Sequence, residues 1–93
     1  MYVVNITGGR AMYVITEHEI LDPEAFWHQA SGVFTHPPHG IRLHTAMVVE
    51  RETLCQCMWE SASLDAVRDY LEPALGKASN NTYGEVDPDI AIR

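Results

Sequence analysis

Apolar and polar residues alternate along several stretches of this chain, and a period of two predicts β-strands. Strands are expected at residues 11–20, 41–49, 53–60 and 82–86. The first is rich in Tyr, Val, Ile and Thr, which is typical of a central strand. In the second, odd-numbered residues form one face and even-numbered residues the other. The charged turn at 50–52 then joins the second and third strands into a hairpin.

A helix is predicted after the first strand, where Asp22 can cap it, Pro23 suits its first position and Glu24 complements its dipole. Gly32 is expected at its end or close to it. Its apolar face has helical spacing and consists of Phe26, Ala30 and Val33.

A second helix is predicted before the last strand, capped by Ser61 or Ser63, with Asp65 in its first turn. Pro73 is expected to stop it near Leu71 or Glu72, followed by a terminal turn at 73–76 and a polar loop at 77–81. Its buried stripe is expected to be Leu64, Val67, Leu71 and Leu75.

The resulting element order, β-α-β-β-α-β, predicts a ferredoxin-like α+β fold: a four-stranded antiparallel sheet with two helices on one face. Residues 1–93 are expected to form a single domain, with 1–10 as an N-terminal extension or extra strand and 88–93 as a tail. The uncovered face would carry apolar side chains, among them Ala46, Val48, Leu54 and Met58. A monomer does not tolerate a large apolar face, so we expect a homodimer packed through it.

Charge and composition exclude several kinds of partner. The chain has a net charge of −7 and only 6 Lys and Arg residues, which disfavours nucleic acids and anionic membranes. It contains no apolar run of about 20 residues and no apparent signal peptide. Cys55 and Cys57 are expected to be reduced thiols. The expected localisation is cytoplasmic.

Two segments carry a resemblance to a known family. A third strand that ends in Trp59-Glu60 leads directly into a capped helix, within 57–67 (CMWESASLDAV), and the last strand follows at 81–86 (NTYGEV). Over roughly residues 11–87 the chain resembles the dimeric α+β barrel superfamily, and within it small bacterial domains of largely unassigned function. The resemblance implies a dimer with a cavity in each subunit, either between the sheet and the helices or within the barrel.

Proteins of that architecture include cofactor-independent monooxygenases, haem-degrading enzymes, lactone isomerases, polyketide cyclases and a nickel-binding protein. Because one fold serves so many activities, the resemblance does not choose among them. The choice depends on the side chains.

Three of the chain's 5 histidines, His36, His39 and His44, lie within nine residues. Neutral imidazole binds divalent transition metals such as zinc, copper, nickel and iron, so these residues are the candidate metal ligands. Their spacing matches no strong zinc pattern. The interpretation that the pattern favours is a solvated polar loop stiffened by Pro37 and Pro38, and proton transfer by one of these histidines is the third interpretation.

His44 is the best single candidate for chemistry. The strand pattern places it on one face with Arg42, and together these two could orient and protonate an enolate or a carboxylate. An interfacial histidine that hydrogen-bonds across a dimer is the alternative. The candidate ligand-binding residues on neighbouring strands are Tyr13, Gln56, Met58 and Glu60.

Two hypotheses follow. The first is a homodimeric barrel that binds an apolar small molecule, with His44 transferring a proton if the protein is an enzyme. The second is a metal-binding (nickel-type) or stress-related protein that uses the histidine loop without catalysis. The sequence leaves open whether the protein is an enzyme, and a divalent transition metal is the one cofactor it suggests.

Overall fold

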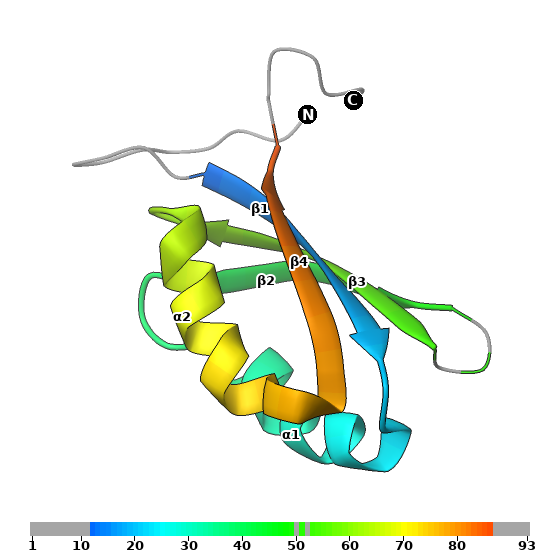
Figure 1. The fold of residues 1–93 in the computed structure, drawn as a ribbon. Helices are drawn as coiled ribbons and strands as arrows, with labels where there is room; N and C mark the ends of the chain where they lie inside the picture. The colour runs from blue at the N-terminus through cyan, green and yellow to red at the C-terminus, as the bar shows by residue number, and fades with distance from the viewer. Residues whose placement is uncertain (1–11, 50, 52, 87–93) are drawn as a thin grey trace.

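The computed structural model has one antiparallel sheet with both helices on the same face (Figure 1). It describes residues 12–49, 51 and 53–86. The sheet order is β2-β3-β1-β4, which is the ferredoxin-like α+β arrangement predicted from the sequence. The predicted extension at 1–10 and tail at 88–93 lie outside the described residues. In chain order the elements are β1 (Met12–Ile20), α1 (Pro23–Thr35), β2 (Arg42–Val48), β3 (Leu54–Ser61), α2 (Leu64–Leu75), the 3₁₀ turn η2 (Gly76–Ala78) and β4 (Ser79–Glu85).

The start of α1 is the predicted one. The Asp22 carboxylate accepts a hydrogen bond from the backbone N–H of Ala25 at 3.1 Å, and Pro23 occupies the first helical position. At the other end the helix runs through Gly32 to Thr35. The C-cap is His36, whose N–H bonds the Gly32 carbonyl. Gly32 therefore lies inside the last turn of the helix.

Replacing Gly32 with alanine is expected to stabilise the protein by about 0.5–1 kcal/mol, because alanine restricts the unfolded chain and favours the helix. A Cβ atom at this position meets nothing within 4 Å, so no packing is lost. Thermal unfolding should show a midpoint raised by about 2–8 °C. Gly76→Ala is the matched control: its φ of +52° is left-handed, and alanine there should lower the midpoint. A lower midpoint for Gly32→Ala would contradict this description of α1.

The second helix corrects one prediction. Ser63 is its N-cap, accepting from the Ala66 N–H at 3.0 Å, while Ser61 ends β3. The helix does not stop before Pro73 but contains it and continues to Leu75. Proline removes only one backbone hydrogen bond so near the end of a helix. Leu71 and Leu75, one turn apart and both buried, hold the last turn against the core.

The last strand also begins earlier than predicted. Instead of a polar loop at 77–81, the chain makes the turn η2 and enters β4 at Ser79, three residues before the expected start. Pairing with β1 fixes this segment although its composition is not β-prone: Ser79 lies opposite Ile20 and Asn81 opposite His18. Tertiary pairing overrides local propensity here.

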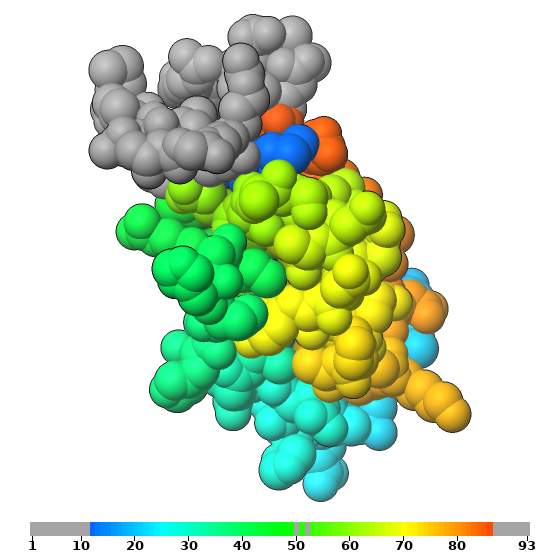
Figure 2. Space-filling model, turned by 90° about the vertical axis from the view of Figure 1, so that its left-hand side faces the viewer, coloured from blue at the N-terminus to red at the C-terminus, as the bar shows by residue number. Residues whose placement is uncertain are grey.

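The core lies between the sheet and the helices. Figure 2 shows α2 (yellow) lying across this side of the molecule with α1 (cyan) below it. Because side chains alternate along a strand, β1 and β3 each send every second residue into this layer. The largest fully buried side chains include Trp59, Phe26, Leu71, Leu75, His18 and Val14.

A β-bulge interrupts the predicted alternation of β2. The register with β3 shifts between Leu43 and Thr45, so His44 is an extra residue in the strand. After the bulge, the residues of β2 lie on the opposite face of the sheet from the one that simple alternation predicts. Ala46 and Val48, predicted on the uncovered face, lie opposite Cys57 and Cys55 and therefore share the helix-covered face.

Candidate functional site

The sheet face without helices, here called the open face, carries a row of three polar side chains across three adjacent strands. Arg42 on β2 lies opposite Glu60 on β3, and Glu60 lies opposite Tyr13 on β1. All three were candidate site residues from the sequence. The structure places them side by side because their register positions share one face.

The bulge brings His44 to this row. Its Nε2 atom lies 2.8 Å from Glu60 Oε1, and the two side chains are only 13% and 22% exposed. The ring of Tyr13 stands 5.5 Å from the His44 ring, tilted by 58°. The bond to Glu60 places the proton on Nε2, since a carboxylate can only accept. An imidazole oriented in this way by a carboxylate is suited to moving a proton.

The remaining candidates continue the open face toward the hairpin end. Met58 is half-buried and lies opposite Ile15 on β1 and Thr45 on β2. Gln56 donates from Nε2 to Glu17 Oε2 at 2.9 Å, which ties it to its neighbouring strand. All six residues proposed for catalysis or ligand binding therefore belong to one face of the sheet.

The predicted metal ligands are not grouped in the same way. His36 is exposed, and its Nδ1 atom lies 2.8 Å from the Thr35 hydroxyl. His39 is exposed in the loop, and His44 is engaged with Glu60. Within residues 12–49, 51 and 53–86, no three His, Cys, Asp or Glu side chains are arranged to hold a metal ion.

The two cysteines are free and buried on the helix-covered face, with their sulfur atoms 3.8 Å apart. The hydrogen bond with Cys55, together with burial, raises the pKa of the Cys57 thiol. Cys57 therefore stays protonated and behaves as a core residue.

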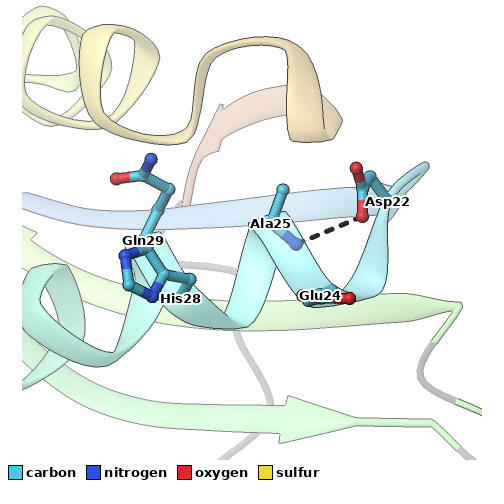
Figure 3. A pocket seen from close by; sticks show the side chains of 5 residues that line it. All are labelled: Asp22, Glu24, Ala25, His28 and Gln29. Atoms are coloured by element: carbon cyan, nitrogen blue, oxygen red, sulfur yellow. Dashed lines mark hydrogen bonds between the residues drawn. The ribbon is translucent and has the colours of Figure 1, made fainter.

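A separate, shallow hollow lies at the start of α1 (Figure 3). It is open to solvent, and none of the candidate residues of the open face contributes to it. The Asp22 carboxylate already caps the helix, because it accepts a hydrogen bond from the Ala25 N–H. The hollow is lined by Asp22, Glu24, Ala25, His28 and Gln29.

Sequence reasoning missed a buried polar network on the helix-covered face. Thr16 Oγ1 lies 2.9 Å from His18 Nε2, and His18 Nδ1 lies 2.7 Å from Asn81 Oδ1. A hydroxyl, an imidazole and an orienting amide in this order have the connectivity of a nucleophile, base and orienter. Thr16 and His18 are, however, both 0% exposed, and Trp59 Nε1 donates to the Thr16 hydroxyl at 3.0 Å. No substrate reaches them in this conformation.

The alternation of residues along β1 could have predicted part of this network. Val14, Thr16, His18 and Ile20 share one face of the strand, so burying Val14 also buries His18. The partner Asn81 could not be foreseen, because its segment was predicted as a loop.

Comparisons of the chain with models of protein families, with curated proteins and with solved structures find no match. Across the part of the chain that the structure describes, no helix is long and apolar enough to cross a membrane.

Proposed function

We propose that this protein is a homodimeric α+β barrel of the dimeric α+β barrel superfamily, in which two open faces pack together around a small-molecule cavity. The ferredoxin-like fold is the architecture that such a barrel requires, with both helices on one face of each sheet. In this arrangement the two sheets form the barrel and the helices lie outside it.

Apolar side chains on the open face support packing against a second copy. Ile15, at the centre of β1, is 38% exposed, and Met47 on β2 is 57% exposed. Ile15 lies with half-buried Met58 in the register row next to the polar row, and Met47 lies one row further, opposite Gln56. Exposed apolar surface of this extent on a 93-residue chain favours association, since a small domain buries only about 60–65% of its unfolded surface.

The His44–Glu60 pair supports a cavity that orients a ligand, and this pair carries the proposal. A half-buried imidazole held by a carboxylate, beside an aromatic ring, suits proton transfer to or from a bound organic molecule. Arg42 makes no ion pair with any residue that the structure describes, so its guanidinium can meet an anionic group of the ligand. The ligand class that fits is a flat apolar molecule with one carboxylate, enolate or phenolate group.

A ligand screen followed by NMR tests this proposal. Aromatic carboxylic acids and phenols should shift the signals of Tyr13, His44 and Met58 in the wild-type protein. His44→Ala should weaken the best binder about tenfold, as expected for losing one hydrogen bond to a charged group. His39→Ala, which removes an exposed loop histidine, is the control and should leave the affinity unchanged. Binding that is equally strong in His44→Ala, or that shifts signals only on the helices, would contradict the proposal.

A further inference from the structure

The open face carries exposed charges of opposite sign at its two ends. Arg42 lies in the polar row, and it is the only Lys or Arg residue in the four strands that the structure describes. Its side chain is exposed and forms no ion pair with a described residue. Glu60, opposite it, is less exposed and already hydrogen-bonded to His44. Arg42 is therefore the charge that this end of the face presents to a partner.

The other end of the open face, toward the β2–β3 hairpin, is acidic. Glu17 and Glu19 alternate with buried residues of β1, so both carboxylates are exposed on the same face as Tyr13. Their hydrogen bonds come from neutral amides. Gln56 Nε2 donates to Glu17 at 2.9 Å, and Asn80 Nδ2 donates to Glu19 at 3.0 Å. Among the described residues no cation pairs with either carboxylate.

Arg42 cannot neutralise these carboxylates within one chain. Four residues of β1 separate Tyr13, which shares the row of Arg42, from Glu17, and this is about 13 Å at the rise of a strand. Arg51 in the hairpin turn is closer in sequence, but it stands between two glutamates there and forms no ion pair with a described residue. The opposite charges of the open face can therefore meet only between two molecules.

Two copies can pack their open faces in two ways. Sheets that pack face to face keep their strand directions within about 30° of each other, so a two-fold axis between them runs nearly along the strands or nearly across them. An axis along the strands gathers Glu17 and Glu19 of both copies at one end. An axis across the strands brings the acidic end of each copy over the Arg42 end of the other. The apolar row of Ile15 and Met58 lies between the ends in both cases, so charge decides between them.

We propose that the second copy docks on the open face with the two-fold axis across the strands, so that Arg42 faces Glu17 of the partner subunit. This inference rests on the proposed dimer and adds its orientation. Glu17 of the partner subunit then stands at the rim of the cavity beside the polar row, and both copies bound each cavity. The guanidinium has five N–H donors, so Arg42 can bind this carboxylate and an anionic group of the ligand at the same time.

Charge reversal tests the orientation, with the dimer dissociation constant measured by sedimentation equilibrium. Glu17→Arg and Arg42→Glu should each raise this constant about tenfold, because each places like charges at two equivalent contacts. Glu17→Arg changes the net charge of the chain from −7 to −5, since a guanidinium replaces a carboxylate, and general repulsion between the chains becomes weaker. Tighter association of Glu17→Arg is the result expected for an axis along the strands, and it would overturn the proposal.

Glu85→Arg is the control with the same change in charge. Glu85 is exposed on β4, but it lies opposite Val14 and therefore points to the helix-covered side of the sheet. Its replacement should not weaken the dimer. Weakening equal to that of Glu17→Arg would mean that position on the open face is irrelevant, and it would overturn the proposal.

Mixing the two single variants provides a second test. A heterodimer of Glu17→Arg with Arg42→Glu has opposite charges at both contacts again, so the mixture should associate within about threefold of the wild type. The double variant Glu17→Arg/Arg42→Glu should recover in the same way, and both positions are exposed, so the fold is kept. A dimeric wild type with no recovery on mixing would overturn the orientation alone. A wild type that stays monomeric would overturn the proposed dimer itself.

Discussion

Thr16→Val is expected to lower the free energy of unfolding by about 2–6 kcal/mol, although the two side chains have nearly the same shape and valine favours strands. The hydroxyl accepts from Trp59 Nε1 and is also hydrogen-bonded to His18 Nε2, and all three residues are 0% exposed. Valine leaves both partners unsatisfied in the core, and each unsatisfied buried polar group costs roughly 1–3 kcal/mol. Urea unfolding at neutral pH measures the change.

Thr53→Val is the matched control for this substitution. Thr53 directly precedes β3, is exposed and lies outside the proposed dimer face, so the same replacement should change stability by less than about 0.5 kcal/mol. If Thr16→Val were as stable as Thr53→Val, the buried network would contribute nothing to the fold.

Phe26→Ala is expected to lower the free energy of unfolding by about 3–5 kcal/mol, since it removes a large, fully buried side chain from the core. Phe26 is 0% exposed and stands edge-on to Trp27 at 4.9 Å and near Phe34 at 6.4 Å. It also packs on the His18 ring, so the loss opens a cavity beside the buried network. Chemical denaturation of Phe26→Ala beside His28→Ala, an exposed position on the same helix, measures the effect. A loss below about 1 kcal/mol would mean that α1 does not anchor the core.

The sequence was sufficient to predict the fold and the two faces of β3. The caps of α1 and α2 depend on local chemistry at Asp22 and Ser63, and both form as expected. The strand order follows from the element order. The predictions that were wrong concern local structure that distant contacts decide. The helix α2 continues past Pro73 because Leu75 is buried, and β4 begins at Ser79 because β1 pairs with it.

The candidate site shows the same division. Alternation indicated the face of Arg42 and Glu60, whereas the face of the first strand that carries Tyr13 was left open. In the structure Arg42, Glu60 and Tyr13 share one row. The bulge at His44 was not predictable from the alternation, which runs through it without interruption. After the bulge, the residues of β2 lie on the faces opposite to those predicted. His44 itself is still hydrogen-bonded to Glu60 on the open face. The His18 network depends on Asn81 and could not be seen before the register of β4 was known.

The network on the helix-covered face and the pair on the open face give β1 two different roles. Its inward residues fix the core through Thr16 and His18, while its outward residues, Tyr13 and Ile15, belong to the proposed dimer face. A substitution at Ile15 can therefore change association without disturbing the core.

Sedimentation velocity at micromolar concentration tests the central claim, that two open faces form the barrel. The wild type should sediment with twice the 10.4 kDa mass of the chain, and Ile15→Glu should convert it to a folded monomer by placing a charge in the interface. Leu21→Glu, which replaces another exposed apolar residue outside the sheet, should remain a dimer. A wild-type protein of 10.4 kDa under these conditions would contradict the proposed barrel.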